Sequence, residues 1–109
     1  MTDYSIATAV RILEELHAGL DRAYWEASSI ERKDFFYDLI SAVHSELSEI
    51  GKLSVQDLDL SYEPITANFR AARQKLSTLK LSLEIYVLRT STRDRLAVLI
   101  EDVLAFPPL

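Results

Sequence analysis

The sequence is 109 residues long and contains only two Gly and three Pro, so it lacks the turn residues that β-sandwiches, barrels and collagen-like repeats require. It has no Cys, which excludes disulfide scaffolds, Cys-based zinc sites and thiol nucleophiles. An apolar share of 49% and a charged share of 27% are typical of one soluble globular domain. The net charge of −5 marks an acidic protein and disfavours a general affinity for nucleic-acid phosphates.

The first half of the sequence predicts two amphipathic helices, over residues 3–27 and 30–50. Apolar residues in both segments recur at steps of three and four, the spacing of one helix face. Ser28 and Glu31 have the spacing of a capping box at the start of the second helix. Gly51 lies where a left-handed residue commonly ends a helix. So few residues separate the helices that they must form an antiparallel hairpin.

Residues 52–63 break the helical period and predict a linker. The linker ends before Pro64, a residue favoured in the first turn of a helix. Two further helices are predicted, over residues 64–89 and 92–105, with hydroxyl N-caps available at Thr90–Thr92. Twelve extended residues span about 40 Å, whereas a twenty-residue helix is about 30 Å long. The third helix can therefore run either parallel or antiparallel to the second.

Two short segments leave an alternative open. Residues 79–89, and more briefly residues near 53–62, alternate apolar and polar side chains as strands do, which would give an α+β fold. The helical stripe continues through 79–89, so we expect a single all-α domain over residues 1–109, a four-helix bundle built from two antiparallel hairpins. Gly19, inside the first helix, would allow a neighbouring helix to approach closely.

The strongest indication of an interface is a second apolar face near the end of the third helix. Leu81, Ile85 and Leu88 have helical spacing but lie opposite the core stripe, so either the rest of the chain or another molecule covers them. Trp25 lies at the tip of the first hairpin, where an aromatic residue with a polar handle can anchor a partner. We therefore expect these four residues to bind protein.

A metal site is the second hypothesis. Glu14 and His17 form a Glu-x-x-His pair of the kind found twice in di-iron bundles, but the sequence has no second copy. His44, on the second helix, is the remaining imidazole that could join them. These three residues are weak candidate ligands, and a boundary histidine hydrogen-bonded to a neighbouring helix, with solvated acids, is the simpler explanation of the pattern.

A nucleic-acid interface is the third hypothesis, because the charge is uneven. Residues 1–63 carry thirteen acidic and five basic side chains, a balance of −8, whereas residues 64–109 carry four acidic and seven basic, a balance of +3. The basic residues of interest are Arg70, Arg73, Lys80, Arg89, Arg93 and Arg95. No aromatic residues interleave with them, so the simpler expectation is that this flank faces the acidic first two helices.

The sequence contains no nucleophile elbow and no phosphate-binding loop, so we assign no catalytic residue and no cofactor. It also has no apolar run of membrane-spanning length and no signal-peptide pattern, so we expect a cytoplasmic protein without a membrane partner. The leading hypothesis is a non-enzymatic protein-interaction module that self-associates as a homodimer. Adaptors, chaperone-like proteins and immunity or antitoxin-like proteins share this composition, but such a likeness does not establish function.

Overall fold

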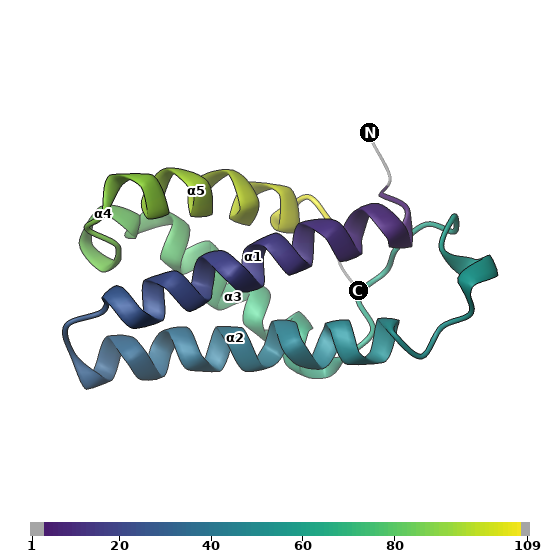
Figure 1. The fold of residues 1–109 in the computed structure, drawn as a ribbon, viewed down its shortest axis with the longest axis horizontal. Helices are drawn as coiled ribbons and strands as arrows, with labels where there is room; N and C mark the ends of the chain where they lie inside the picture. The colour runs from purple at the N-terminus through teal and green to yellow at the C-terminus, as the bar shows by residue number, and fades with distance from the viewer. Residues whose placement is uncertain (1–3, 108–109) are drawn as a thin grey trace.

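The apolar stripes form four long helices and one short helix within residues 4–107, which the computed structural model describes (Figure 1). No strand occurs among these residues. The all-α bundle is therefore confirmed for the described part of the chain. In chain order the elements are α1 (Ile6–Glu26), α2 (Ile30–Ile50), the 3-10 turn η1 (Val55–Asp57), α3 (Ala67–Leu81), α4 (Leu83–Tyr86) and α5 (Thr90–Leu104).

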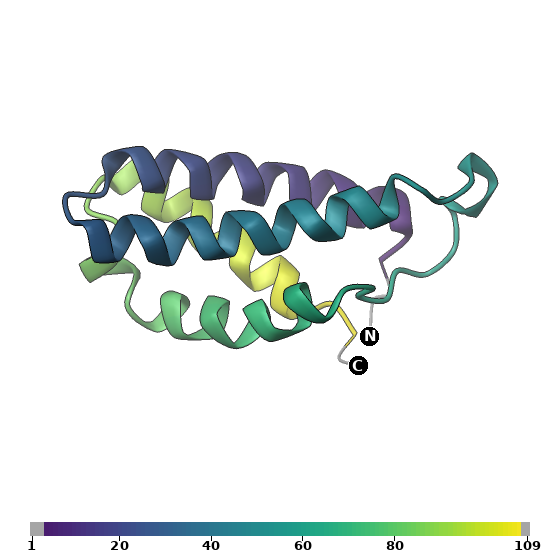
Figure 2. The same ribbon diagram turned by 90° about the horizontal axis from the view of Figure 1, so that it is seen from below.

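The four long helices form a closed ring in which each packs against two neighbours. Helix α1 contacts α2 and α5, and α3 contacts α2 and α5. Neighbouring helices run in opposite directions, so α3 is antiparallel to α2 (Figures 1 and 2). This arrangement settles the direction that the linker length left open. The α1–α2 turn and α4 lie at one end of the bundle, and the linker lies at the other.

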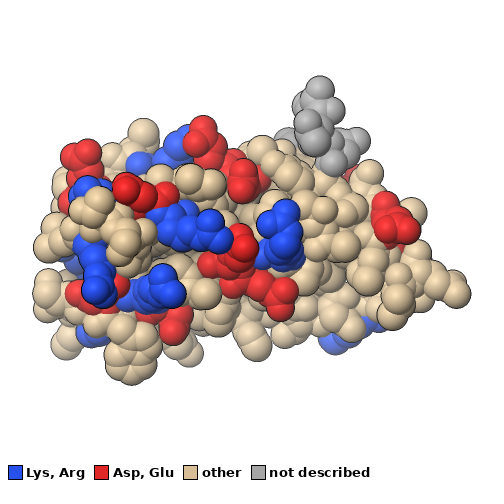
Figure 3. All heavy atoms as spheres, turned by 45° about the horizontal axis from the view of Figure 1, so that its top comes forward, with Lys and Arg blue, Asp and Glu red and all other residues tan. Residues whose placement is uncertain are grey.

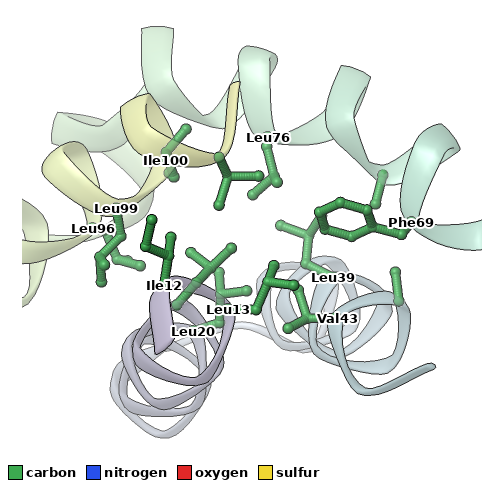
Figure 4. Packing of buried hydrophobic residues seen from close by; sticks show 14 of the residues in the cluster. Ile12, Leu13, Leu20, Leu39, Val43, Phe69, Leu76, Leu96, Leu99 and Ile100 are labelled. Atoms are coloured by element: carbon green, nitrogen blue, oxygen red, sulfur yellow. The ribbon is translucent and has the colours of Figure 1, made fainter. Parts of the chain in front are cut away.

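The core is a single cluster of aliphatic and aromatic side chains from all four long helices. Figure 4 shows these side chains pointing inward between the helices. Fully buried residues of the cluster include Leu13, Leu20, Leu39, Val43, Phe69, Leu76, Leu96 and Ile100. Burial of each leucine side chain stabilises the fold by about 1.5–3 kcal/mol, so this cluster is the main source of stability.

The first helical hairpin is confirmed, but its capping residues differ from those predicted. Ser29, and not Ser28, caps α2, because the Ser29 hydroxyl accepts the backbone N–H of Arg32 at 3.2 Å. The capping box of Ser28 with Glu31 is therefore wrong by one residue. Gly51 has φ −62° and ψ −16°, so the helix ends in a right-handed conformation and not the predicted left-handed one. The predicted start of α1 at residue 3 lies outside the described residues, and Ile6 is the first helical residue.

Helix α3 begins later than predicted. Thr66 is its N-cap, accepting the backbone N–H of Phe69 at 3.1 Å, so Pro64 precedes the helix and does not lie in its first turn. The predicted helix over 64–89 is also interrupted. Ser82, at φ −122° and ψ 20°, separates α3 from α4, and Val87 is extended. The strand alternative for 79–89 is wrong, because this segment contains the last residues of α3, then α4 and the turn before α5.

The linker is tied to the start of α1 by its backbone. The N–H groups of Ile6 and Ala7 donate to the carbonyls of Leu60 and Leu58 at 2.9 and 3.1 Å. These bonds satisfy two of the donors that a helix start leaves free. Ser61 forms only an isolated bridge with Ser5, so the strand alternative near 53–62 is also wrong. Helix α5 starts at Thr90, two residues before the prediction, without a hydroxyl cap.

Gly19 marks the closest approach of α1 and α5. A Cβ atom at this position would lie 2.9 Å from Leu96 Cδ2, which is itself fully buried. The predicted role of Gly19 is therefore confirmed.

We predict opposite effects for alanine at the two glycines. Gly19→Ala should lower the free energy of unfolding by about 1 kcal/mol, because overpacking against Leu96 outweighs the better helix propensity of Ala. Gly51→Ala should raise it by about 0.5–1 kcal/mol, because Gly51 already has a conformation that Ala adopts freely. Urea unfolding measures both effects. A gain in stability for Gly19→Ala would contradict the close packing.

Candidate functional site

The structure brings the two candidate metal-binding histidines together but supplies no third ligand among the described residues. The rings of His17 on α1 and His44 on α2 have centroids 6.3 Å apart and are tilted by 49°. Within residues 4–107, no group of three or more His, Asp or Glu side chains is placed to hold a metal ion. Glu14 is exposed and does not complete such a group. The arrangement favours two imidazoles that share a helix–helix seam.

The basic residues of the second half are mostly engaged within the molecule. Arg70 donates to the carbonyl of Pro64 at 3.1 Å. Three others form exposed ion pairs, each contributing at most about 1 kcal/mol, namely Lys80 with Glu101 (3.6 Å), Arg89 with Glu26 (3.7 Å) and Arg95 with Glu15 (3.0 Å). The expected pairing with the acidic first half is therefore confirmed for Arg89 and Arg95, whereas Lys80 pairs with α5. Arg93 takes part in no ion pair with the described residues.

A buried carboxylate holds the start of α3. Glu46 on α2 is fully buried, and its Oε2 accepts the hydroxyl of Tyr62 and the backbone N–H of Ile65, the latter at 2.7 Å. Its Oε1 accepts the N–H of Thr66 at 2.8 Å. Carboxylates are stabilised at helix N-termini by free N–H groups and by the helix dipole. Glu46 is thus a long-range cap for α3.

A partly buried guanidinium, that of Arg73, caps the end of α5. Arg73 on α3 donates to the carbonyls of Leu104, Phe106 and Pro107 at 3.2, 2.6 and 2.8 Å. Burial lowers the pKa of Arg73. Burial also raises the pKa of Tyr62 well above its usual value, and the hydrogen bond to Glu46 raises it further. The ring of Tyr62 packs edge-on against Phe106, with centroids 4.9 Å apart.

Sequence reasoning missed this polar cluster, although one signal for it exists. Glu46 follows Val43 by three residues and precedes Ile50 by four, so an acid occupies a position on the apolar stripe of α2. A charged residue at a core position is rarely buried unless it is paired. No comparable signal marks Tyr62, because the linker has no period from which its burial could be inferred.

The clearest candidate for a functional surface is at the opposite end of the bundle, on the outer side of α4. We call it the α4 surface, formed by Leu81, Ile85 and Leu88, which are 87%, 60% and 73% exposed. The inward-facing residues of the same segment, Leu79 and Leu83, are buried. Helix α4 and the α4–α5 turn therefore leave the predicted second apolar face open.

A hollow of about 360 Å³ adjoins the α4 surface. Leu81 and Ile85 line one side of it, with Leu83 and Ala97 also lining it. We call it the α4 hollow. Trp25 is 72% exposed at the same end of the bundle, where its ring packs against Tyr24 and Lys33, and it does not line the α4 hollow.

Charges of both signs surround this end of the molecule (Figure 3). Lys80, Glu84, Arg93 and Asp94 line the α4 hollow, so its ionisable groups sum to zero. By contrast, the exposed apolar residues of the linker, among them Val55 and Leu60, lie among three acids, Asp57, Asp59 and Glu63.

No protein family, curated protein or solved structure was found to match this chain. No helix within residues 4–107 combines the length and the hydropathy needed to cross a membrane. The function is therefore inferred from the chain's own surface.

We predict that Glu46→Gln lowers the free energy of unfolding by about 2–4 kcal/mol. The NH₂ group of the glutamine would replace one carboxylate oxygen, so the protein groups that now donate to that oxygen would lose their acceptor. Each unsatisfied buried donor costs about 1–3 kcal/mol. Glu49→Gln, one turn further along α2 and partly exposed, is the matched control and should cost under about 0.5 kcal/mol. Equal losses in the two variants, measured by urea unfolding, would contradict the buried cap.

We predict that the stability cost of Tyr62→Phe depends on pH. Below pH 10 the variant should be less stable by about 1–3 kcal/mol, because the hydroxyl bond to Glu46 is lost. Above pH 10 a tyrosine in the unfolded chain ionises, whereas Tyr62 in the folded chain keeps its proton because its pKa is raised. The free energy of unfolding of the wild type therefore falls by about 1.4 kcal/mol per pH unit because of this group. The deficit of the variant should therefore shrink as the pH rises.

Urea unfolding between pH 8 and 11 measures this change. Tyr37→Phe, which removes the hydroxyl of an exposed tyrosine, is the control over the same pH range. A Tyr62→Phe deficit that stays constant over the same range would show that Tyr62 does not titrate differently in the folded and unfolded chains.

Proposed function

We propose that this protein is a non-enzymatic interaction module that forms a homodimer through the α4 surface. The observation that carries the proposal is the exposure of Leu81, Ile85 and Leu88 on one short segment. Contiguous apolar surface on a soluble protein marks interaction sites more often than single exposed residues do. Removing apolar surface from water contributes about 25 cal/mol per Å², so these side chains favour a partner.

The bundle itself gives no reason for these residues to be apolar. Leu79, Leu83 and Val87 already close the core at this end, and all three are buried. Leu81, Ile85 and Leu88 are not part of the core cluster and are not among the side chains packed against it. Their apolar character is therefore better explained by a contact outside the chain.

A second copy fits the α4 surface better than it fits the exposed apolar residues of the linker. Two linker surfaces brought together would also bring together Asp57, Asp59 and Glu63 from each copy, and like charges in contact cost several kcal/mol. The charges lining the α4 hollow are balanced, so two copies can meet there although each chain carries a net charge of −5.

We predict that replacing two residues of the α4 surface abolishes the dimer. Leu81→Glu combined with Ile85→Glu should sediment as a folded monomer at concentrations where the wild type is a dimer. The burial of a glutamate in the contact costs several kcal/mol. The matched control is Val55→Glu, which adds a charge at a similarly exposed apolar residue at the other end of the bundle and should stay dimeric.

Circular dichroism verifies that each variant is folded. A wild type that sediments as a monomer at every concentration would overturn the proposed homodimer. A dimer that persists in the double variant would show that the contact lies elsewhere.

A further inference from the structure

The α4 surface carries both halves of a self-complementary contact. Leu81 and Ile85 project from α3 and α4, and both border the α4 hollow, which lies between α4 and the first half of α5. An apolar side chain from one copy can therefore enter the hollow of a second copy, and the reverse contact forms at the same time. Such reciprocity is the property of an isologous two-fold interface.

Charges of both signs line the hollow, with Lys80 on α3, Glu84 on α4, and Arg93 and Asp94 on α5. Glu84 is on α4, beside Ile85, whereas Arg93 is on α5, across the hollow. Neither residue forms an ion pair with another described residue. Lys80, which also lines the hollow, is already paired with Glu101. Glu84 and Arg93 are thus free to meet groups on a partner.

From this arrangement we infer that Glu84 of each copy pairs with Arg93 of the other across a two-fold axis. When Leu81 or Ile85 of one copy enters the hollow of the second, Glu84 comes opposite the facing α5, where Arg93 lies next to Asp94. The two-fold axis repeats the pair, so one dimer contains two identical ion pairs. The inference rests on the proposed homodimer and specifies its symmetry and its register.

Charge reversal with mixing tests this geometry. Glu84→Arg alone places a second guanidinium opposite Arg93 in both halves of the dimer, and Arg93→Glu alone places two acids opposite each other. Each variant should raise the dimer dissociation constant at least about 10-fold at low salt. The two variants are then mixed in equal amounts, so that heterodimers can form.

 If positions 84 and 93 met within one copy, mixing would change nothing, because one variant carries two bases at these positions and the other carries two acids. Across the two-fold axis the mixture instead pairs Arg with Glu at both positions, so it should form a heterodimer of near wild-type affinity.

The controls separate this pairing from a general effect of charge. Glu63→Arg and Arg11→Glu make the same charge changes at exposed residues that form no ion pair with described residues, and each should dimerise like the wild type alone and mixed. High salt should bring the dimer dissociation constants of Glu84→Arg and the wild type closer together, because screening weakens exposed charge pairs. Sedimentation and native mass spectrometry of a mass-tagged variant measure the species.

The outcomes are distinguishable from those of the proposed function. The two-fold pairing is supported if each single variant dimerises weakly and the mixture of the two dimerises like the wild type. Weak single variants whose mixture stays monomeric overturn it, as does normal dimerisation of both single variants, and in either case dissociation by Leu81→Glu with Ile85→Glu would leave the proposed homodimer standing. A wild type that never dimerises overturns both the pairing and the homodimer.

Discussion

The buried carboxylate of Glu46 is the constraint on which the rest of the bundle depends. A carboxylate at 0% exposure must find donors for both oxygens, because an unpaired buried charge costs several kcal/mol. Its donors are Tyr62, Ile65 and Thr66, which lie within the last five residues before α3. The linker must therefore bring the start of α3 back to the last turns of α2, and α3 can only run antiparallel to it.

The same constraint shapes the linker end of the bundle. Because α3 starts opposite Glu46, the last four residues of α2, about 6 Å along its axis, extend beyond the start of α3. The aromatic rings of Tyr62 and Phe106 fill the space beyond α3 and α5. Arg73, placed by the same start of α3, then reaches the carbonyl of Leu104 at the end of α5 and those of Phe106 and Pro107 just after it. Each cap thus depends on the helix that the previous cap has positioned.

The sequence predicts the local elements well and the long-range polar contacts poorly. The three-four spacing gives α2 its bounds, Ile30–Ile50, and gives the hairpin, because apolar periodicity is a local property. The break at Ser82 depends on how the chain must turn to pack. The direction of α3 depends on Glu46 and Tyr62, sixteen residues apart, whose pairing no periodicity encodes. The meeting of the two histidines is predictable from the helical stripes, whereas the lack of a third ligand among the described residues depends on the packing.

The strand-like alternation near residues 79–89 and the α4 surface have one physical origin. Leu79, Leu83 and Val87 face the core at steps of four, and a second apolar stripe at steps of four and three faces outward. Two opposed helical stripes offset by two residues produce the same apolar–polar alternation as a strand. The bundle needs only the inner stripe for its core. The outer stripe is therefore the part of the pattern that folding does not explain, which is why we propose a contact with a second molecule there.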